Sequence, residues 1–372
     1  MVAIAHEMKI PERILMGPGP SNVHPRVLTA MSMPVIGHLD PIFLRLMDQT
    51  MELLRSVFQT NNRLTIPVSG TGSAGMEAAF VNFIEEGDKV VVGIKGVFGE
   101  RVADLLRRIK AEVIEVKEEW GKPVDIGRIE KEIKKNHVKA VAIVHAETST
   151  GVLQPIEELG KIVRERDALF IVDTVTSLGG VPVKVDEWLI DVCYSGTQKC
   201  LSCPPGISPF TVNERAVSVM KNRRTRIPTW YLDLTMIEKY WGSERLYHHT
   251  APISMIYALR ESLKLVLEEG LEKRFSRHRE NYRYLEEKMK ELGIEYLVEE
   301  KYRLPNLNSV LIPQGLSDKD VRKRLLDDYN IEIGGGLGVL AGKIWRIGLM
   351  GYSSNKENIN LLVKALGNIM IR

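Results

Sequence analysis

The sequence has few cysteines. It contains three in 372 residues, and Cys193, Cys200 and Cys203 all lie in one short segment. An odd and clustered set argues against a disulfide framework and is typical of a reducing compartment. Cys200 and Cys203 form a C-x-x-C pair, but no second pair and no nearby histidine completes a zinc site. We therefore expect buried or redox-silent thiols and no bound metal.

Long apolar runs and a strong net charge are also missing. No stretch is long enough to span a membrane, and residues 1–13 carry charged side chains where a signal peptide needs an apolar core. The net charge of +3 gives no reason to expect nucleic acid or an acidic membrane as a partner. The basic cluster 221–226 has no aromatic stacking platform beside it, so a solvated or subunit-interface surface explains it better. We expect a cytoplasmic protein that binds neither membranes nor nucleic acid.

The chain is long enough for two domains. Its 372 residues, 44% of them hydrophobic, exceed what one simple core accommodates. Val/Ile-rich runs alternate with amphipathic patterns, which predicts an α/β fold with a mostly parallel sheet covered on both faces. The expected strands are residues 64–68, 89–94, 112–116, 140–144 and 169–172, and the expected helices are 40–58, 77–84, 99–109, 125–135 and 155–165.

The last hundred or so residues have a different pattern, in which charged helices alternate with isolated strands. This pattern predicts a smaller α+β domain. The resulting division is an N-terminal arm (1–15), a large α/β domain (16–265) and a small C-terminal domain (266–372). The small domain is expected to contain helices 274–292, 318–329 and 356–369 and strands 309–312 and 343–348.

One lysine, Lys199, follows a break in an apolar stretch. Residues 191–194 read as a buried strand, and Ser195-Gly-Thr197 then interrupts it with small polar residues. A lysine placed there lies at the carboxyl edge of a parallel sheet, where open α/β folds bind ligands. Burial disfavours the ammonium form and frees the amine for Schiff-base chemistry. The alternative is an ordinary solvated surface lysine.

A hydroxyl-rich turn precedes another predicted helix. Thr71-Gly-Ser73 lies between a strand and a helix, where hydroxyls and free N–H groups can hold a phosphate. The alternative is a helix cap at Ser73, although no capping box follows it. Phe98 opens the next strand-to-helix turn and can stack on a planar ligand there, or pack in the core.

Two further polar residues follow apolar strands. Asp173 ends the strand 169–172, and such an acid is costly to bury unless a cation or N–H group faces it. It can hold a protonated pyridine nitrogen or cap the next turn. Thr148 follows the strand 140–144 and can donate to a ring hydroxyl or belong to a turn.

Three further motifs lie in the last third of the chain. Arg346 lies in a predicted strand, where its guanidinium suits a substrate carboxylate or a structural ion pair. Gly334-Gly-Gly336 lacks the Lys-Ser/Thr of a phosphate loop, so we interpret it as a turn. The adjacent histidines of Tyr247-His-His-Thr250 point to different sides of a helix or strand, which argues against a metal site.

These residues together match the needs of pyridoxal phosphate. The cofactor requires a lysine for a Schiff base, an acid at the pyridinium nitrogen, a stacking ring and a phosphate cup. Each requirement is met by a residue or turn that follows a predicted strand. These are Lys199 for the Schiff base, Asp173 for the acid, Phe98 for the stacking ring and the turn 71–73 for the phosphate cup. Parallel strands bring such ends to one edge of a sheet.

The chain resembles the class V aminotransferases of pyridoxal-phosphate fold type I, and most closely the alanine–glyoxylate and serine–pyruvate aminotransferases. The resemblance runs in order along almost the full length. It rests on Gly17-Pro-Gly-Pro-Ser-Asn22, Phe58-Gln-Thr60, Glu147-Thr-Ser-Thr-Gly-Val-Leu-Gln-Pro155, Asp173-Thr-Val-Thr-Ser-Leu-Gly-Gly180, Tyr194-Ser-Gly-Thr-Gln-Lys199, Tyr247-His-His-Thr250, Leu259-Arg-Glu-Ser262 and Gly335-Gly-Leu-Gly338.

The resemblance implies a role for each matching position. Lys199 would bind the cofactor covalently and shuttle the substrate proton, and Asp173 would keep the pyridinium protonated. Arg346 and the backbone around Gly19 would hold the substrate carboxylate. Tyr247 and Thr250 would complete the phosphate cup of the neighbouring subunit, which implies a homodimer with active sites at its interface. The implied cofactor-binding residues are Thr71, Gly72, Ser73, Phe98, Thr148, Asp173, Val175, Gln198, Lys199, Tyr247 and Thr250.

Two positions depart from the familiar pattern of the family. Phe98 stands where the stacking residue is usually Trp, and Ser73 stands where close animal relatives have His, which leaves substrate preference open. The end Ile-Met-Ile-Arg372 carries no peroxisomal signal.

The implied function is a cytoplasmic aminotransferase that uses pyridoxal 5′-phosphate. It would move the amino group of serine or alanine to glyoxylate or pyruvate by a ping-pong mechanism. A lyase or desulfurase on the same fold is an alternative, although Cys200 and Cys203 lie beside Lys199 rather than on a mobile loop. A non-catalytic scaffold is the other alternative, and the presence of Lys199, Asp173 and Arg346 argues against it.

Overall fold

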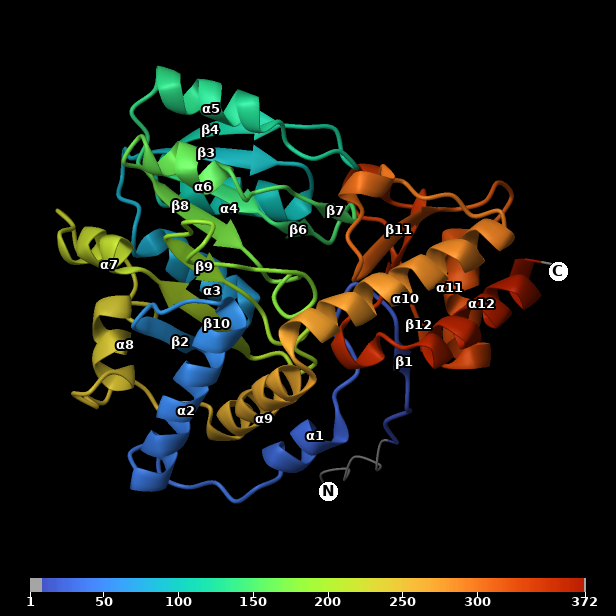
Figure 1. Cartoon of the computed structure of the whole chain (residues 1–372), viewed down its shortest axis with the longest axis horizontal. Helices are drawn as coiled ribbons and strands as arrows, with labels where there is room; N and C mark the ends of the chain where they lie inside the picture. The colour runs from blue at the N-terminus through green and yellow to red at the C-terminus, as the bar shows by residue number, and fades with distance from the viewer. Residues whose placement is uncertain (1–8, 371–372) are drawn as a thin grey trace, which may run out of the picture.

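The computed structural model describes residues 9–370. Residues 1–8 of the predicted arm and the last two residues of the chain lie outside this described part. A large α/β part comes first in the chain, and the orange and red elements of the C-terminal part pack beside it (Figure 1). Among the described residues, no helix is both long and apolar enough to cross a membrane.

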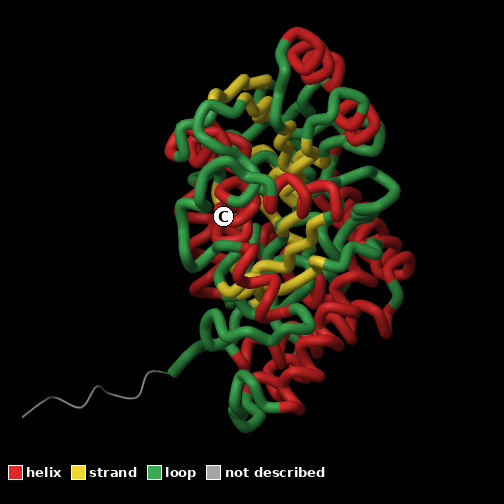
Figure 2. Tube along the Cα trace, turned by 90° about the vertical axis from the view of Figure 1, so that its left-hand side faces the viewer, coloured by secondary structure: helices red, strands yellow, loops and turns green. Residues whose placement is uncertain are grey.

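The large part is built on a seven-stranded sheet in the order β2-β10-β9-β8-β5-β3-β4. Only β10 runs against its neighbours, so the predicted mostly parallel sheet is confirmed. Strands lie through the middle of the molecule with helices on both sides (Figure 2). The strands are β2 (Leu64–Ser69), β3 (Lys89–Ile94), β4 (Glu112–Lys117), β5 (Ala140–Val144), β8 (Leu169–Asp173), β9 (Val192–Tyr194) and β10 (Ile207–Val212).

The interior strands are buried, apart from Lys89 at the start of β3, as their apolar sequences predict. Strands β5 and β8 contain no exposed residue, because helices cover both faces of a parallel sheet. The helices of the large part are α1 (Pro25–Met31), α2 (Pro41–Phe58), α3 (Gly72–Val81), α4 (Val97–Arg108), α5 (Ile126–Lys135), α6 (Leu159–Arg164), α7 (Glu214–Lys221), α8 (Leu234–Trp241) and α9 (Ile253–Glu269).

Helix α2 illustrates how local sequence sets an element. Asp40 caps its amino end by accepting a 2.7 Å hydrogen bond from the N–H of Ile42, and Pro41 occupies the first turn, where its missing N–H costs nothing. Phe43, Met47 and Leu54 are buried on one face. The helix ends where Gln59 adopts a left-handed conformation with φ of 53°.

The smaller part is an antiparallel sheet covered by helices. Strand β14 (Ile344–Gly348) lies between β11 (Leu307–Leu311) and β13 (Gly334–Gly335). The helices are α10 (Leu271–Glu291), α11 (Asp318–Tyr329) and α12 (Lys356–Met370). The interpretation of the triple glycine as a turn is wrong for its first two residues, since Gly334 pairs with Arg346 in the sheet.

The N-terminal segment belongs to the smaller part. Strand β1 (Ile14–Leu15) pairs in parallel with β12 (Ile331–Glu332), and Met16 is buried in the smaller core with Trp345. The predicted division at residue 265 falls inside α9, which packs in the large core as far as Val266. Gly270, between α9 and α10, is therefore the division that we propose.

Candidate active site

Loops at the carboxyl edge of the large sheet enclose a cavity of about 220 Å³. These loops follow β2, β3, β8 and β9, whose parallel directions bring their ends to one edge. Eight of the predicted site residues line the cavity, together with two that were not predicted. The lining residues are Thr71, Gly72, Ser73, Met76, Phe98, Arg101, Asp173, Val175, Gln198 and Lys199.

Lys199 extends from the loop after β9 into a site that is shielded from solvent. Burial, with a smaller contribution from the nearby Arg346 guanidinium, lowers the pKa of its amine to about 8. Its Nζ donates a hydrogen bond to the carbonyl of Pro18. At pH 7 about one tenth of this amine is therefore unprotonated, far more than for an ordinary lysine, and the free amine is the form that acts as a nucleophile or proton acceptor.

The segment around Gly19 lies directly against this lysine. A Cβ at Gly19 would come within 2.5 Å of the Lys199 Nζ, and its φ of +108° also favours glycine. Ser21 ties the segment to the lysine loop, since its N–H donates to the Gln198 carbonyl at 2.9 Å and its hydroxyl to the Lys199 carbonyl at 2.7 Å. The two hydrogen bonds of Ser21 thus hold the neighbouring Gly19 beside the amine of Lys199.

Asp173 is the last residue of β8 and is buried beneath the cavity. Burial raises the pKa of its carboxyl to about 6, and a hydrogen bond of 2.8 Å from the N–H of Val175 opposes this rise. Above pH 6 the group is therefore a carboxylate in a dry site. Such a group strongly favours a positively charged partner.

The amino end of α3 forms another wall of the cavity. Thr71 occupies the N-cap position, but its side chain makes no capping hydrogen bond, so the first N–H groups of the helix remain available to a ligand. The structure thus places the cap at Thr71 rather than at Ser73. The side-chain carbonyl of Gln198 is buried with no hydrogen-bond partner among the described residues. The free N–H groups can donate hydrogen bonds to a phosphate, and the Gln198 side chain lies beside them.

Phe98 lies in the first turn of α4, and its ring faces the cavity with Arg101 beside it. The Arg101 guanidinium lies 4.8 Å from the centre of the Phe98 ring. The sequence analysis did not predict Arg101 and Met76 as site residues. Each lies three or four residues beyond a predicted site residue on the same helix. This i, i+3 or i, i+4 spacing is the signal that would have identified them.

Arg346 and Thr148 are close to one another but lie outside the cavity lining. The Arg346 Nε donates to the carbonyl of Gly335 at 2.7 Å, and a terminal nitrogen donates to the carbonyl of Thr148 at 3.2 Å. Burial lowers the pKa of the Arg346 guanidinium to about 10, and it remains charged at neutral pH. Its effect on the Lys199 pKa indicates that the two groups face the same region.

Tyr247 and Thr250 were predicted to reach the site of a neighbouring subunit rather than that of their own chain. Both are exposed, Tyr247 by 61%, and neither lines the cavity around Lys199. The Tyr247 ring lies 5.0 Å from that of His38, a contact outside the cavity. A single chain therefore does not bring these two predicted residues into the site.

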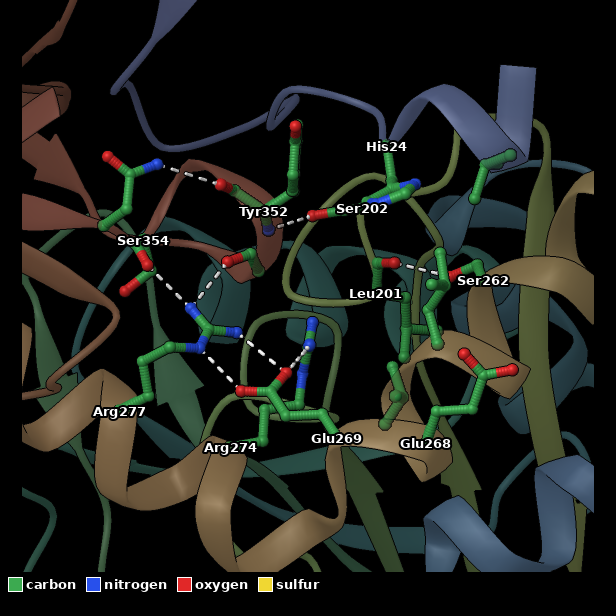
Figure 3. A pocket seen from close by; sticks show the side chains of 15 residues that line it. His24, Leu201, Ser202, Ser262, Glu268, Glu269, Arg274, Arg277, Tyr352 and Ser354 are labelled. Atoms are coloured by element: carbon green, nitrogen blue, oxygen red, sulfur yellow. Dashed lines mark hydrogen bonds and ion pairs between the residues drawn. The ribbon is translucent and has the colours of Figure 1, made fainter. Parts of the chain in front are cut away.

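A larger cavity, of about 520 Å³, also borders the loop after Lys199 but contains none of the predicted site residues. Its charged groups bind one another: Arg277 forms two hydrogen bonds to Glu269, at 2.6 and 3.0 Å, and Arg274 forms one at 2.6 Å (Figure 3). Such a cluster of charged groups bonded to one another is typical of a structural ion-pair network. The smaller cavity, which contains the predicted site residues, is therefore the candidate active site.

Comparison with known proteins gives a consistent result. The family model for aminotransferase class V matches residues 16–362. The (S)-ureidoglycine–glyoxylate transaminase of Bacillus subtilis is 44% identical over 98% of this chain and 92% of that protein. The alanine–glyoxylate aminotransferase of Rattus norvegicus is 41% identical over 98% of this chain and 89% of that protein. The crystal structure of an alanine–glyoxylate aminotransferase from Nostoc sp. is 50% identical and superposes with a TM-score of 0.97, covering 99% of this chain and 97% of that one.

Proposed function

This chain belongs to the class V aminotransferases, and from that membership we propose that it transfers the amino group of serine or alanine to glyoxylate or pyruvate by a ping-pong mechanism. Glyoxylate is the acceptor with the best support, because it appears in the names of relatives whose donors differ. The donor is less constrained, and (S)-ureidoglycine is a candidate beside the small amino acids. The observation that carries the proposal is the cavity that unites Lys199, Asp173 and the amino end of α3.

The residues of the cavity fit pyridoxal 5′-phosphate, the cofactor of this family. Three features support the fit: the uncapped amino end of α3, the unpartnered side-chain carbonyl of Gln198 and the buried Asp173 carboxylate. Thr71, Gly72, Ser73 and Gln198 would hold the phosphate, and Phe98 would stack on the ring. Val175 packs against this region, since a Cβ at Gly72 would lie 3.1 Å from it.

The bound cofactor supplies an electron-withdrawing ring that acidifies the Cα–H of the substrate. Lys199 would hold the cofactor covalently, and its amine would take the proton from one carbon and return it to another. Asp173 would hold a proton on the ring nitrogen, because its carboxylate needs a positive partner in a dry site. Thr148 would lie near the ring hydroxyl.

Arg346, with Gly19 opposite it, would bind the carboxylate of the substrate through two parallel N–H···O bonds. We expect Arg346→Leu to raise KM for the amino donor about 10–100-fold, which corresponds to losing about 1.5–3 kcal/mol of charged hydrogen bonding. Cofactor binding should be unchanged. The measurement is the initial rate at varied donor concentration, together with the absorbance of the bound cofactor.

Arg322→Leu is the matched control for this prediction. Arg322 lies beside Gly335 in the same part of the molecule and pairs with Asp318 at 2.8 Å. Its loss removes a similar charge from the neighbourhood but no proposed substrate contact. An unchanged KM in Arg346→Leu, or an equal rise in both variants, would refute the role of Arg346.

We propose that the active form is a homodimer in which Tyr247 and Thr250 reach the phosphate of the partner subunit. Their exposure within one chain supports this arrangement, as does a set of exposed apolar residues on the large part. That set includes Leu28, Val35, Ile42, Trp230 and Leu246. Exposed apolar surface of this kind marks protein interfaces.

Subunit complementation tests the shared site. Lys199→Ala and the double variant Tyr247→Ala, Thr250→Ala should each be nearly inactive as homodimers. After the two are unfolded and refolded together, half of the dimers should be mixed, and each mixed dimer has one site with neither defect. We expect recovery of about one quarter of wild-type activity. No recovery, with mixed dimers demonstrated by native mass spectrometry, would place both residues in their own subunit's site.

The alternative of a desulfurase is disfavoured by its need for a reactive thiol. Cys200 and Cys203 are almost completely buried, and burial raises the pKa of the Cys200 thiol to about 11. Cys193 is also buried and unpaired. Three unpaired thiols also agree with a reducing cytoplasmic location, which we propose for this enzyme.

Product analysis tests the proposed reaction. The purified protein is incubated with glyoxylate and one donor at a time, and glycine formation is quantified. Parallel double-reciprocal plots would support the ping-pong order, whereas intersecting plots would contradict it. Absence of glycine with every donor would overturn glyoxylate as the acceptor.

A further inference from the structure

Glu147 is a buried carboxylate that the proposed reaction does not use. It ends β6 (Ala146–Glu147), which forms a short hairpin with β7 (Val152–Leu153), and it does not line the cavity around Lys199. Its two carboxylate oxygens instead accept hydrogen bonds from the N–H groups of Phe98, at 3.5 Å, and Gly99, at 3.4 Å. Ser149 extends this arrangement, because its hydroxyl accepts from the N–H of Val97 at 3.0 Å while its own N–H donates to Glu147 at 3.2 Å.

Helix α4 needs these partners, because it begins without a cap of its own. Its N-cap residue is Gly96, which has no side chain to accept hydrogen bonds from the first turn. Glu147 and Ser149 act as the cap from another loop, and the carboxylate also lies at the positive end of the helix dipole. The close approach requires glycine at position 96. A Cβ there would lie 2.3 Å from the Ser149 hydroxyl and 2.6 Å from the Glu147 Cδ.

The charge of Glu147 is balanced inside the protein. Lys95, which is buried and adjacent to Gly96, donates a hydrogen bond to the carbonyl of Val144 and faces Glu147 and Asp173. Burial lowers the pKa of Lys95 to about 8, and the two carboxylates oppose that shift. Glu147 likewise raises the pKa of Arg346 against the effect of burial. A carboxylate flanked by two cations in a dry site is held firmly in place.

We propose that Glu147 is a positioning residue that fixes the Phe98 ring against the cofactor by holding the amino end of α4. Phe98 is both a hydrogen-bond donor to Glu147 through its N–H and a lining residue of the cavity through its ring. The inference rests on the proposed function, in which that ring stacks on pyridoxal 5′-phosphate. Preorganised rings bind planar ligands better because less ordering is required on binding.

A double-mutant cycle tests this role. The affinity for pyridoxal 5′-phosphate is measured by titration of the full-length protein in wild type, Glu147→Gln, Phe98→Ala and the combined variant. Loss of the stacking ring should lower the affinity up to about tenfold. We expect Glu147→Gln to lower it by a similar factor and the combined variant to lose about tenfold rather than about a hundredfold, because both changes remove the same interaction.

Asp125→Asn is the matched control. Asp125 caps α5 by accepting a 2.8 Å hydrogen bond from the N–H of Gly127 and does not line the cavity, so the same change from acid to amide at this helix should leave the cofactor affinity unchanged. If Glu147→Gln does not fold, Ser149→Ala removes one link of the same cap and should lower the affinity by a smaller factor.

The possible results separate the two proposals. If the combined variant loses affinity by the product of the two single factors, about a hundredfold, the positioning role is refuted but the proposed cofactor site is not. An unchanged affinity in Glu147→Gln would refute the positioning role as well. An unchanged affinity in Phe98→Ala would contradict the proposed stacking, and with it the inference about Glu147.

Discussion

Replacing Lys199 by alanine is expected to lower kcat by about 10³–10⁴-fold while the protein remains folded. The variant loses both the amine that would hold the cofactor and the group that would move the substrate proton. The structure explains why no other residue substitutes for it. Lys95 is a second lysine near Asp173 and is fully buried, but its amine binds the carbonyl of Val144 and does not line the cavity. The measurement is glycine formation from glyoxylate at saturating donor.

Two controls accompany the Lys199 variant. Lys221→Ala removes an exposed lysine and should leave kcat unchanged. Addition of a small primary amine such as ethylamine to Lys199→Ala should restore part of the activity, because it supplies the missing base. Activity close to that of wild type in the variant, without added amine, would remove Lys199 from the mechanism and favour the scaffold alternative.

Asp173→Asn is expected to lower kcat by about 10²–10³-fold. Asparagine has nearly the same shape, but it cannot hold a positive charge at the ring nitrogen in a buried site, where an unpaired charge is costly. Cofactor should still bind, with the affinity that the wild-type protein retains once the Asp173 carboxyl is neutral, since the residues around the phosphate are unchanged. The comparison of kcat with cofactor affinity therefore separates a chemical role of Asp173 from a structural one. Equal loss of folding and of activity would contradict the assignment.

The pH dependence of cofactor binding tests the same residue independently. Burial lowers the pKa of Lys199 to about 8 and raises the pKa of Asp173 to about 6. As pH falls, the wild-type protein should first lose affinity through pH 8, when the amine becomes protonated. It should lose more near pH 6, when the carboxyl becomes neutral and no longer favours a charged ring. Asp173→Asn should keep the first step and lack the second.

Most of the large part could be predicted from its sequence, because each buried parallel strand is an apolar run followed by small or polar residues. The predictions missed α1, α7, α8 and α9 among the helices and β10 among the strands of the large sheet. Strand β10 contains Pro209 in its interior. Proline lacks the N–H that a sheet ladder uses, so it argues against a strand. Here Pro209 lies opposite Pro67 of β2, while its carbonyl accepts a hydrogen bond from Ser195 on the other side. Only the neighbouring strands reveal that this position tolerates proline.

Helix ends were harder to predict than helix existence. The expected helix 155–165 begins only at Leu159, because Pro155 and the turn after it do not continue into a regular helix. The strand β13 was missed for a related reason: two glycines carry no side-chain pattern, and their pairing with Arg346 comes from the sheet alone.

The candidate site was predictable where one residue follows one strand, as for Lys199 and Asp173. It was not predictable where function depends on contacts between loops. The capping of α4 by Glu147 joins loops after β3 and β5, and no local pattern encodes it. The proposed contribution of Tyr247 and Thr250 would depend on a second subunit, which the complementation experiment tests.

The most direct test of the central claim is the visible absorbance of the purified protein during addition of one amino donor without any acceptor. The account predicts a band of bound pyridoxal 5′-phosphate that bleaches with serine, alanine or (S)-ureidoglycine and returns when glyoxylate is added. Bleaching only with another amino acid would keep the enzyme class and overturn the proposed donors. The absence of any band, even after pyridoxal 5′-phosphate is supplied, would contradict the account.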